Sequence, residues 1–443
     1  MRRLAPIFVL ACVALVLFFH QEESPNPLSR LLTPYALVEH HTLQADQWRD
    51  AYDKAVVDGH VYSDKAPLSS FLVLPFYAGM RLFESGPQSQ SDRIAAVHIG
   101  DVVGAAIPFA IFALLLLRRA RREGMSPELS VAIALGATFG TFLFNYGGAF
   151  FGHMLAATFL IGGWALATED KHLRLAGFLG GCSVLTEYPL VLLQAAIVIA
   201  LWFEPDRMRK VRDYVIGAAP CAVLLFVWNF CVTGNPLDFP FSHVPDLFRP
   251  MQHHFGIALP DLGAAWELTF SQFRGAFFYA PALLLFLPLM TYAFAGPNSR
   301  RNVVLLAAAG YLLFVSSYFQ WDGGWCTGPR HLLPPVALLL YEGVGALAKN
   351  PRFLKPFAAL SALGLAVNLL AVSTNPCPND QAKLPVFQIF WPRLVDGKTA
   401  DAILVDMGAP RGAYLVVIWL VLFVAGAIRL AFAARKLLAT EKT

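Results

Sequence analysis

The sequence Tyr62-Ser63-Asp64-Lys65-Ala66-Pro67-Leu68 closes the strongly hydrophilic segment that follows the first hydrophobic run of the chain. The acidic residues Asp46, Asp50, Asp53 and Asp58 precede it, and a short apolar run follows it. Lys65 is therefore a cation at an expected membrane boundary, where its ammonium suits a lipid phosphate. An interfacial lysine also commonly extends to the lipid headgroups with no further role, so both interpretations stay open on this residue alone.

The composition indicates an integral membrane protein. Of the 443 residues, 57% are hydrophobic and 14% are charged. Apolar runs of about 20 residues, each long enough to cross a bilayer, recur throughout. The net charge of +4 is small and dispersed, which gives no indication of nucleic-acid binding. We therefore expect a single all-α polytopic membrane domain over residues 1–443, with the lipid bilayer as a partner.

The basic residues define the expected topology. If residues 66–84 crossed the membrane, the Arg118–Arg122 cluster would lie outside, against the positive-inside rule. Treating 66–84 as an interfacial helix removes this conflict and places both termini in the cytoplasm. The loops 21–93, 234–275 and 374–412 then face outward. The expected spans are residues 5–20, 94–117, 129–147, 150–167, 173–189, 190–204, 211–233, 276–295, 302–319, 331–348, 354–373 and 413–434.

Neither the cysteines nor the paired histidines suggest a metal site. The cysteines at 12, 182, 221 and 231 fall within or at the ends of spans, and they lack metal-site spacing. His40-His41 and His253-His254 lack it too, so we expect no metal and no other cofactor. Cys326 and Cys377 fall in outward loops, where the two could form a disulfide.

The segment 320–331 holds the most specific outward-facing motif. Its glycines allow tight turns, its two tryptophans offer faces on which a sugar can stack, and its arginine offers a forked donor to phosphate. The alternative is an aromatic-belt turn with an ordinary interfacial arginine. The candidate substrate and phosphate contacts in this segment are Trp321, Asp322, Trp325, Arg330 and His331.

Other polar residues gather at the same expected membrane face. Glu187 stands at a helix end near the hydrocarbon edge, where a carboxylate is often functional but can also simply reach water. His153 begins a span, where a histidine can equally be structural, and Arg274 begins another as a second phosphate candidate. A secondary transporter would instead place its key polar groups near the midplane. The clustering therefore favours chemistry at one surface.

The motif Tyr62-x-x-Lys65-x-Pro67-Leu68, after a first transmembrane helix and a carboxylate-bearing loop, resembles the polytopic glycosyltransferases of the GT-C superfamily. The resemblance is closest to the branch of the protein O-mannosyltransferases, the lipid A aminoarabinose transferases and their bacterial relatives. Segments 270–281 and 321–330 are similar to uncharacterised bacterial members. The resemblance implies a GT-C-like bundle of about 12 transmembrane helices in the bacterial inner membrane. Juxtamembrane helices would occupy the first loop, and the active site would be extracytoplasmic.

The resemblance also implies residue roles. In that branch the lysine of the motif binds the phosphate of a polyprenyl-phosphate sugar, which makes Lys65 the donor-phosphate ligand, and Tyr62 is expected near the substrate. Better-known members carry an Asp-Glu pair just before an arginine, whereas Pro27-Leu28-Ser29 precede Arg30 here. The catalytic base must therefore come from elsewhere in the loop. Its candidates are Asp53, then Asp46, with Asp64 weaker.

We therefore expect an inverting glycosyltransferase that moves a sugar from polyprenyl phosphate to an extracytoplasmic glycan, lipid or protein. A carboxylate would take the acceptor's proton, while Lys65, Arg330 and Arg274 would stabilise the departing phosphate. Two alternatives stay open. A transporter or flippase of lipid-linked sugars needs the same cations but no base. An O-antigen polymerase or ligase would use a pyrophosphate-linked donor.

Overall fold

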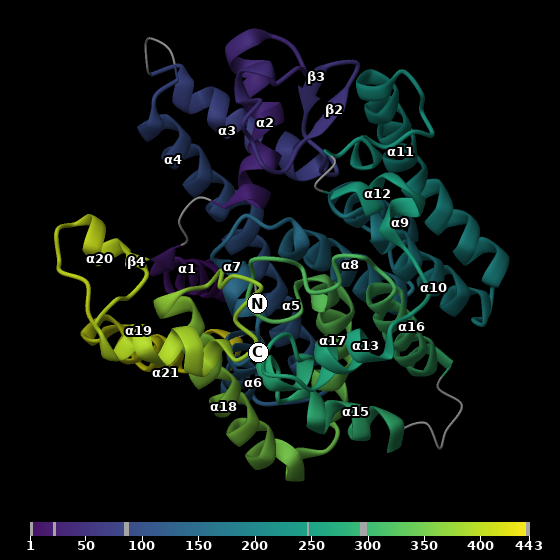
Figure 1. Cartoon of the computed structure of the whole chain (residues 1–443). Coiled ribbons are helices and arrows are strands. Elements are labelled where there is room, and N and C mark those ends of the chain that lie inside the picture. The colour runs from purple at the N-terminus through teal and green to yellow at the C-terminus, as the bar shows by residue number, and fades with distance from the viewer. Residues whose placement is uncertain (1–2, 21–23, 84–87, 246–247, 293–298, 440–443) are drawn as a thin grey trace.

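Helices make up most of the computed structural model, which describes residues 3–20, 24–83, 88–245, 248–292 and 299–439 (Figure 1). Each expected span contains apolar helix, although residues 293–295 of one span lie outside the described residues. The helices at these positions are α1 (Leu4–Val16), α5 (Ile107–Arg122), α6 (Pro127–Phe139), α7 (Leu143–Gly147), α8 (His153–Thr168), α9 (Leu173–Thr186), α10 (Val191–Trp202), α11 (Arg207–Thr233), α14 (Ala276–Tyr279), α15 (Leu283–Tyr292), α16 (Ser299–Ser316), α17 (Leu333–Ala348), α18 (Leu354–Thr374) and α21 (Tyr414–Ala439).

Length and composition identify the chain as a multi-pass membrane protein. Among the described residues, the stretches long and apolar enough to cross a bilayer are Ser91–Arg122, Arg207–Thr233, Arg330–Ala348, Pro351–Thr374 and Tyr414–Leu437. Shorter apolar helices accompany them, α1, α6, α8 and α9 among them. The full number of spans and the side on which each terminus lies stay predictions.

Helix α17 forms the centre of the bundle. The stretch that contains it is 94% buried over its most apolar part, with α5, α8, α15 and α16 against it. Its one carboxylate, Glu342, accepts hydrogen bonds from Trp164 Nε1 at 2.8 Å and from Arg119 Nη2 at 3.3 Å. A buried charge is tolerated when it is paired in this way. Helix α21 is only 17% buried, so its apolar side chains are available to lipid.

A smaller layer built from residues 24–100 covers one end of the bundle and corresponds to the predicted first loop (Figure 1). It contains α2 (Pro25–His40), β2 (Ala55–Val57), β3 (His60–Tyr62), α3 (Leu68–Arg81) and α4 (Gln90–Gly100), and we call it the upper layer. Its core includes Tyr35, Trp48, Val73 and Tyr77. Helix α3 lies within the predicted interfacial segment 66–84, whose last residue is outside the described residues, and it packs on α2.

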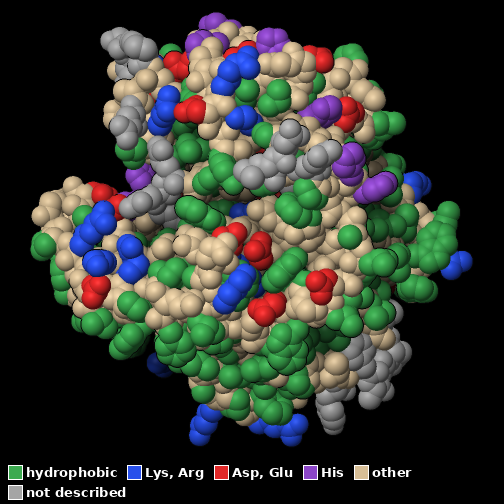
Figure 2. Space-filling view, viewed as in Figure 1, with side chains coloured by type: hydrophobic (Ala, Val, Ile, Leu, Met, Phe, Trp, Pro, Cys, Tyr) green, Lys and Arg blue, Asp and Glu red, His purple; other side chains and the backbone are tan. Residues whose placement is uncertain are grey.

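The other two predicted loops also carry short elements. Residues 234–275 contain α12 (Arg249–Gln252) and α13 (Leu262–Thr269), and residues 374–412 contain α19 (Trp391–Val395), β4 (Asp401–Ala402) and α20 (Ile403–Asp406). Strand β4 pairs with β1 (Phe19–His20), which ties the last loop to the end of α1. Figure 2 shows charged side chains of both signs near the centre of this face, above a large hydrophobic area.

The possible disulfide is not formed, because Cys326 and Cys377 are not bonded to each other. The Sγ atom of Cys326 instead contacts the backbone carbonyl oxygens of Asp322 and Gly328, at 3.5 and 3.7 Å. Cys326 therefore helps to shape the loop before α17 as a buried thiol.

Candidate functional site

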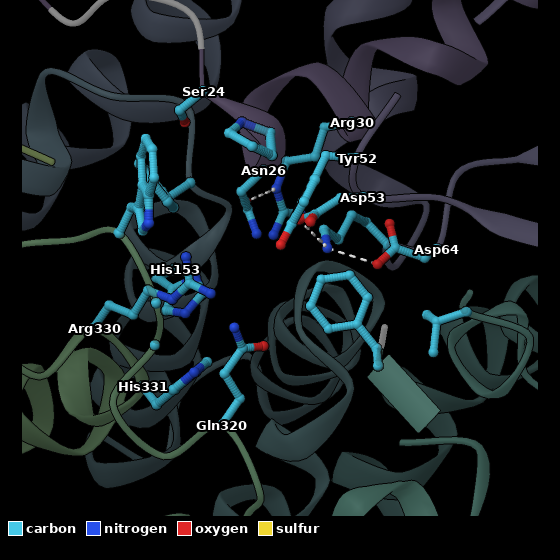
Figure 3. A pocket seen from close by; sticks show the side chains of 18 of the residues that line it. Ser24, Asn26, Arg30, Tyr52, Asp53, Asp64, His153, Gln320, Arg330 and His331 are labelled. Atoms are coloured by element: carbon cyan, nitrogen blue, oxygen red, sulfur yellow. Dashed lines mark hydrogen bonds and ion pairs between the residues drawn. The ribbon is translucent and has the colours of Figure 1, made fainter. Parts of the chain in front are cut away.

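A cavity of about 350 Å³ lies between the upper layer and the bundle, and we call it the polar cavity (Figure 3). Figure 3 shows Asp53 and Asp64 on one side of it and Gln320, Arg330 and His331 across from them. Six separate segments supply its charged and polar lining, which includes Ser24, Asn26, Arg30, Asp53, Asp64, Lys65, His153, Glu187, Gln320, Arg330, His331 and Asp380. The fold thus collects groups that are scattered over most of the chain.

Lys65 reaches the cavity because the β2–β3 hairpin returns the chain to the bundle just before it. The turn at Asp58-Gly59 has φ angles of 49° and 81°, the two-residue geometry that matches the twist of paired strands. Lys65 Nζ then lies 2.7 Å from Asp64 Oδ2 and 3.0 Å from Asp53 Oδ2. Ser29 Oγ donates to Asp64 Oδ1 at 2.5 Å, so the cluster is anchored to α2.

The electrostatics of this cluster keep its ammonium and Asp53 charged. Burial by itself would lower the pKa of Lys65, but Asp53 and Asp64 outweigh burial and raise it. Burial would likewise raise the pKa of Asp53, yet the Lys65 ammonium holds the pKa of Asp53 below its ordinary value. The charges of Arg330 and Arg30 act on Asp53 in the same direction. Asp53 is therefore ionised at neutral pH and can accept a proton.

Arg30 is a central residue of the site that the sequence analysis did not select. It is fully buried on α2 and donates to Asn26 Oδ1 at 3.2 Å, Ser69 Oγ at 3.0 Å and Glu187 Oε1 at 2.6 Å. The same Glu187 oxygen lies 3.1 Å from His153 Nδ1. Arg30 therefore joins the upper layer to the bundle. Its position beside the place of the family's acidic pair was the available signal.

The close approach of these groups depends on Gly152, which precedes α8. A Cβ atom at this position would lie 2.6 Å from Arg30 Nη1 and 2.7 Å from Glu187 Oε1. These distances are shorter than van der Waals contact, so a side chain here would displace the pair. Gly152 thus gives the arginine and the glutamate the room to meet.

Arg330 and His331 bring guanidinium and imidazole nitrogens to the cavity. Glycines with φ angles of 77° at Gly323 and 66° at Gly324 fold the preceding loop, and a Cβ at Gly323 would meet the Arg330 side chain at 2.9 Å. The Arg330 guanidinium lies over the Phe151 ring, 5.5 Å from its centroid. Among the described residues, the buried Nε of Arg330 and Nε2 of His331 have no hydrogen-bond partner. The Arg330 Nε–H is suited to an anion that enters from outside, and His331 Nε2 is so only when it carries the ring proton.

Arg274 has a different role from the predicted one. It is fully buried, lies outside the cavity lining, and donates to the backbone carbonyls of Phe273 at 3.2 Å, Asp322 at 2.6 Å and Gly324 at 2.5 Å. Its donors hold the loop that carries Trp325 and Arg330 in place, so they are not available to a phosphate. In this geometry Arg274 acts as a loop support, and its phosphate-binding role stays a prediction.

Several other candidates also lie outside the cavity lining. Asp46 is bound to His60 Nδ1 at 2.7 Å and to the Val61 amide at 2.8 Å, and it fixes the hairpin. Asp322 Oδ1 accepts from the Gly324 amide at 3.0 Å. The remaining two are Tyr62 and Trp321. Trp325 does line the cavity. In the part of the chain that the structure describes, no three or more His, Cys, Asp or Glu side chains are grouped to hold a metal ion.

A second cavity of about 380 Å³ adjoins the first, and we call it the apolar cavity. It extends between α9, α11 and α16, where aliphatic and aromatic side chains such as Val184, Leu225 and Phe314 dominate its lining. Arg30, Asp64, Lys65, Glu187 and His331 line both cavities. The charged cluster therefore stands where an apolar channel meets a polar one.

The bundle and its covering layer share their fold with a solved structure. The crystal structure of ArnT from Cupriavidus metallidurans bound to undecaprenyl phosphate matches it with a TM-score of 0.51, covering 98% of this chain and 77% of the ArnT chain. The two sequences are 14% identical, so the comparison shows a shared fold. No protein-family model and no curated protein matches the chain.

Proposed function

We propose that the chain is a membrane glycosyltransferase that takes its sugar from a polyprenyl phosphate. The observation that carries the proposal is the row of cations and donors at the junction of the two cavities, with Lys65 and His331 in both linings and Arg330 in the polar one. A lipid phosphate needs such groups at the point where its apolar chain ends. ArnT, which shares the fold, was crystallised with undecaprenyl phosphate.

The substrate would divide between the cavities according to polarity. The polyprenyl chain occupies the apolar cavity, the phosphate binds Lys65 and the free Nε–H of Arg330 beside His331, and the sugar occupies the polar cavity. Each nitrogen of Arg30 already donates to a protein group, so Arg30 contributes charge and position. The branch within the superfamily, the inner-membrane location and the extracytoplasmic site belong to the same proposal.

Transfer follows by one displacement. The acceptor hydroxyl oxygen attacks the anomeric carbon, the bond from that carbon to the phosphate oxygen breaks, and lipid phosphate leaves with the electron pair. Asp53 takes the hydroxyl proton, and the anomeric configuration inverts. Phosphate binding draws the Lys65 ammonium away from Asp53, which makes this carboxylate a stronger base. Asp64 keeps its bond from Ser29 and holds Lys65 in place.

The half-buried carboxylate of Asp53 beside the phosphate cations favours transfer over transport. A flippase needs cations for the phosphate but no base, and an anion next to the phosphate would weaken its binding. Asp53 lies among the cations at 3.0 Å from Lys65, which fits a reaction that must accept a proton.

The test uses the full chain in lipid nanodiscs with radiolabelled undecaprenyl-phosphate and undecaprenyl-pyrophosphate sugars. We expect release or transfer of sugar from the monophosphate donor alone. Use of the pyrophosphate donor would point to the polymerase or ligase alternative. Donor movement across the bilayer of sealed proteoliposomes that hold the full chain, without cleavage, would establish the transporter alternative and overturn the proposal.

A further inference from the structure

We infer that the acceptor is a carbohydrate, bound in a second pocket of the upper layer next to the polar cavity. The inference rests on the proposed glycosyl transfer and adds the class of acceptor to it. The pocket has a volume of about 350 Å³, within the roughly 300–1,000 Å³ that ligand sites occupy. We call it the aromatic pocket, because Tyr35, Trp48 and Tyr52 line it together with Ser24, Asp50 and Arg93.

This lining has the mixed chemistry that a sugar ring requires. A pyranose has apolar C–H faces, which pack on aromatic rings, and an edge of hydroxyl groups, which needs donors and acceptors. The Tyr35 and Trp48 rings pack together with centroids 5.1 Å apart, and Tyr52 is 56% exposed. Asp50 and Arg93 supply a carboxylate and a guanidinium to the same pocket. Aromatic surface and charged hydrogen-bonding groups therefore occur side by side.

Two buried polar atoms in the lining await a partner. Trp48 is 7% exposed and Ser24 is 8% exposed. Within the described part of the chain, neither Trp48 Nε1 nor Ser24 Oγ has a hydrogen-bond partner. A buried donor without a partner costs free energy, and folded proteins rarely leave one in that state. Hydroxyl oxygens of a bound sugar would satisfy both atoms.

The pocket also stands in the correct relation to the proposed base. Ser24, Pro25 and Tyr52 line both the aromatic pocket and the polar cavity, so the two spaces adjoin. The segment 50–53 begins in the pocket with Asp50 and ends in the cavity with Asp53. A sugar in the pocket would present a hydroxyl toward Asp53.

The acceptor would therefore approach from a different side than the donor lipid. The aromatic pocket shares no lining residue with the apolar cavity among the described residues. The acyl chains of a lipid acceptor would need an apolar surface of that second kind, so the observations favour a glycan.

The first test measures binding directly, by saturation-transfer difference NMR on the full chain in nanodiscs. The probes are neutral trisaccharides of glucose, galactose, mannose and rhamnose. We expect saturation transfer to at least one trisaccharide. The signal should be smaller in Trp48→Phe, which keeps an aromatic ring and removes the Nε1–H donor, and in Arg93→Gln. The matched control is Trp266→Phe on α13, an exposed tryptophan outside the pocket, which should give the wild-type signal. The inference is overturned if no trisaccharide shows saturation transfer, or if the saturation-transfer signal is equal in wild type and Trp48→Phe.

The second test uses the same trisaccharide as acceptor with an undecaprenyl-phosphate sugar. Trp48→Phe should raise the acceptor KM about tenfold, through one lost hydrogen bond, and should change the donor KM less. Sugar transfer to a Ser/Thr-rich peptide or to lipid A, with no trisaccharide active, overturns the carbohydrate acceptor and leaves glycosyl transfer standing. If no sugar leaves the donor, the proposed function fails, and the NMR result alone decides whether the pocket binds carbohydrate.

Discussion

At the residue scale, one ammonium is shared between two carboxylates. Lys65 contacts Asp64 at 2.7 Å and Asp53 at 3.0 Å, and of these two carboxylates only Asp64 has a second bond within the described residues, from Ser29. Asp64 is therefore the fixed partner that orients the lysine. Asp53 is the partner that a phosphate can replace, which separates the structural carboxylate from the proposed base.

Removal of either cation of the proposed phosphate site, Lys65 or Arg330, should impair use of the donor. Lys65→Met or Arg330→Gln each deletes a charge-assisted contact, which should lower kcat/KM about 10- to 100-fold, or roughly 1.5–3 kcal/mol. Lys65→Arg keeps the charge and is the control. Thermal unfolding in the same nanodiscs separates a folding defect from a binding defect. Normal kcat/KM in both neutral variants would count against the phosphate site.

Replacement of the base should affect turnover more than binding. Asp53→Asn keeps the shape of the side chain and should lower kcat at least about a hundredfold. The depressed pKa of Asp53 means that the base is lost only as the pH falls below the ordinary aspartate value of about 3.9. The kcat/KM profile should therefore have no acid limb above that pH. In Lys65→Met, the largest charge that opposes burial is lost, so the pKa of Asp53 should rise and the limb should move to higher pH. Full activity of Asp53→Asn would transfer the role to another residue.

At the element scale, the Arg30–Glu187 pair holds the end of α9 against α2, and Gly152, just before α8, lies beside that pair. Gly152→Ala would push a methyl group into that pair, and we expect a loss of about 1–3 kcal/mol in stability. The control is Gly79→Ala in α3, where a Cβ would meet nothing within 4 Å. Gly79→Ala should be neutral or slightly stabilising, because alanine favours helix. Equal melting temperatures for the two variants would contradict the packing described.

The elements also explain what the sequence could and could not predict. Apolar runs and basic loops give the helices, because their pattern is local. Lys65 and Arg330 could be selected because each ends a polar segment near a span. The pairing of Arg30 could not be predicted, since its partner Glu187 lies 157 residues away. The contacts of Arg274 could not be predicted either, because its partners are backbone carbonyls, which no sequence motif reveals.

At the scale of the whole molecule, the account needs the upper layer and the loop 374–412 on the same side of the bilayer, opposite the Arg118–Arg122 cluster. Impermeant thiol labelling of intact cells, in a cysteine-free background, tests this arrangement. Arg118 and Lys398 are both exposed, whereas Ala120 is buried and unsuitable. We expect label at Lys398→Cys and none at Arg118→Cys. The reverse pattern would invert the topology.

The proposed function requires that a polyprenyl phosphate binds with its phosphate between Lys65 and Arg330 and its chain in the apolar cavity. The most direct measurement is a cryo-electron microscopy structure of the full chain in nanodiscs with undecaprenyl phosphate. We expect phosphate density within hydrogen-bond distance of Lys65 Nζ and Arg330, with density for the polyprenyl chain continuing between α9, α11 and α16. Phosphate density elsewhere, with the Lys65–Asp53 contact unchanged, would contradict it.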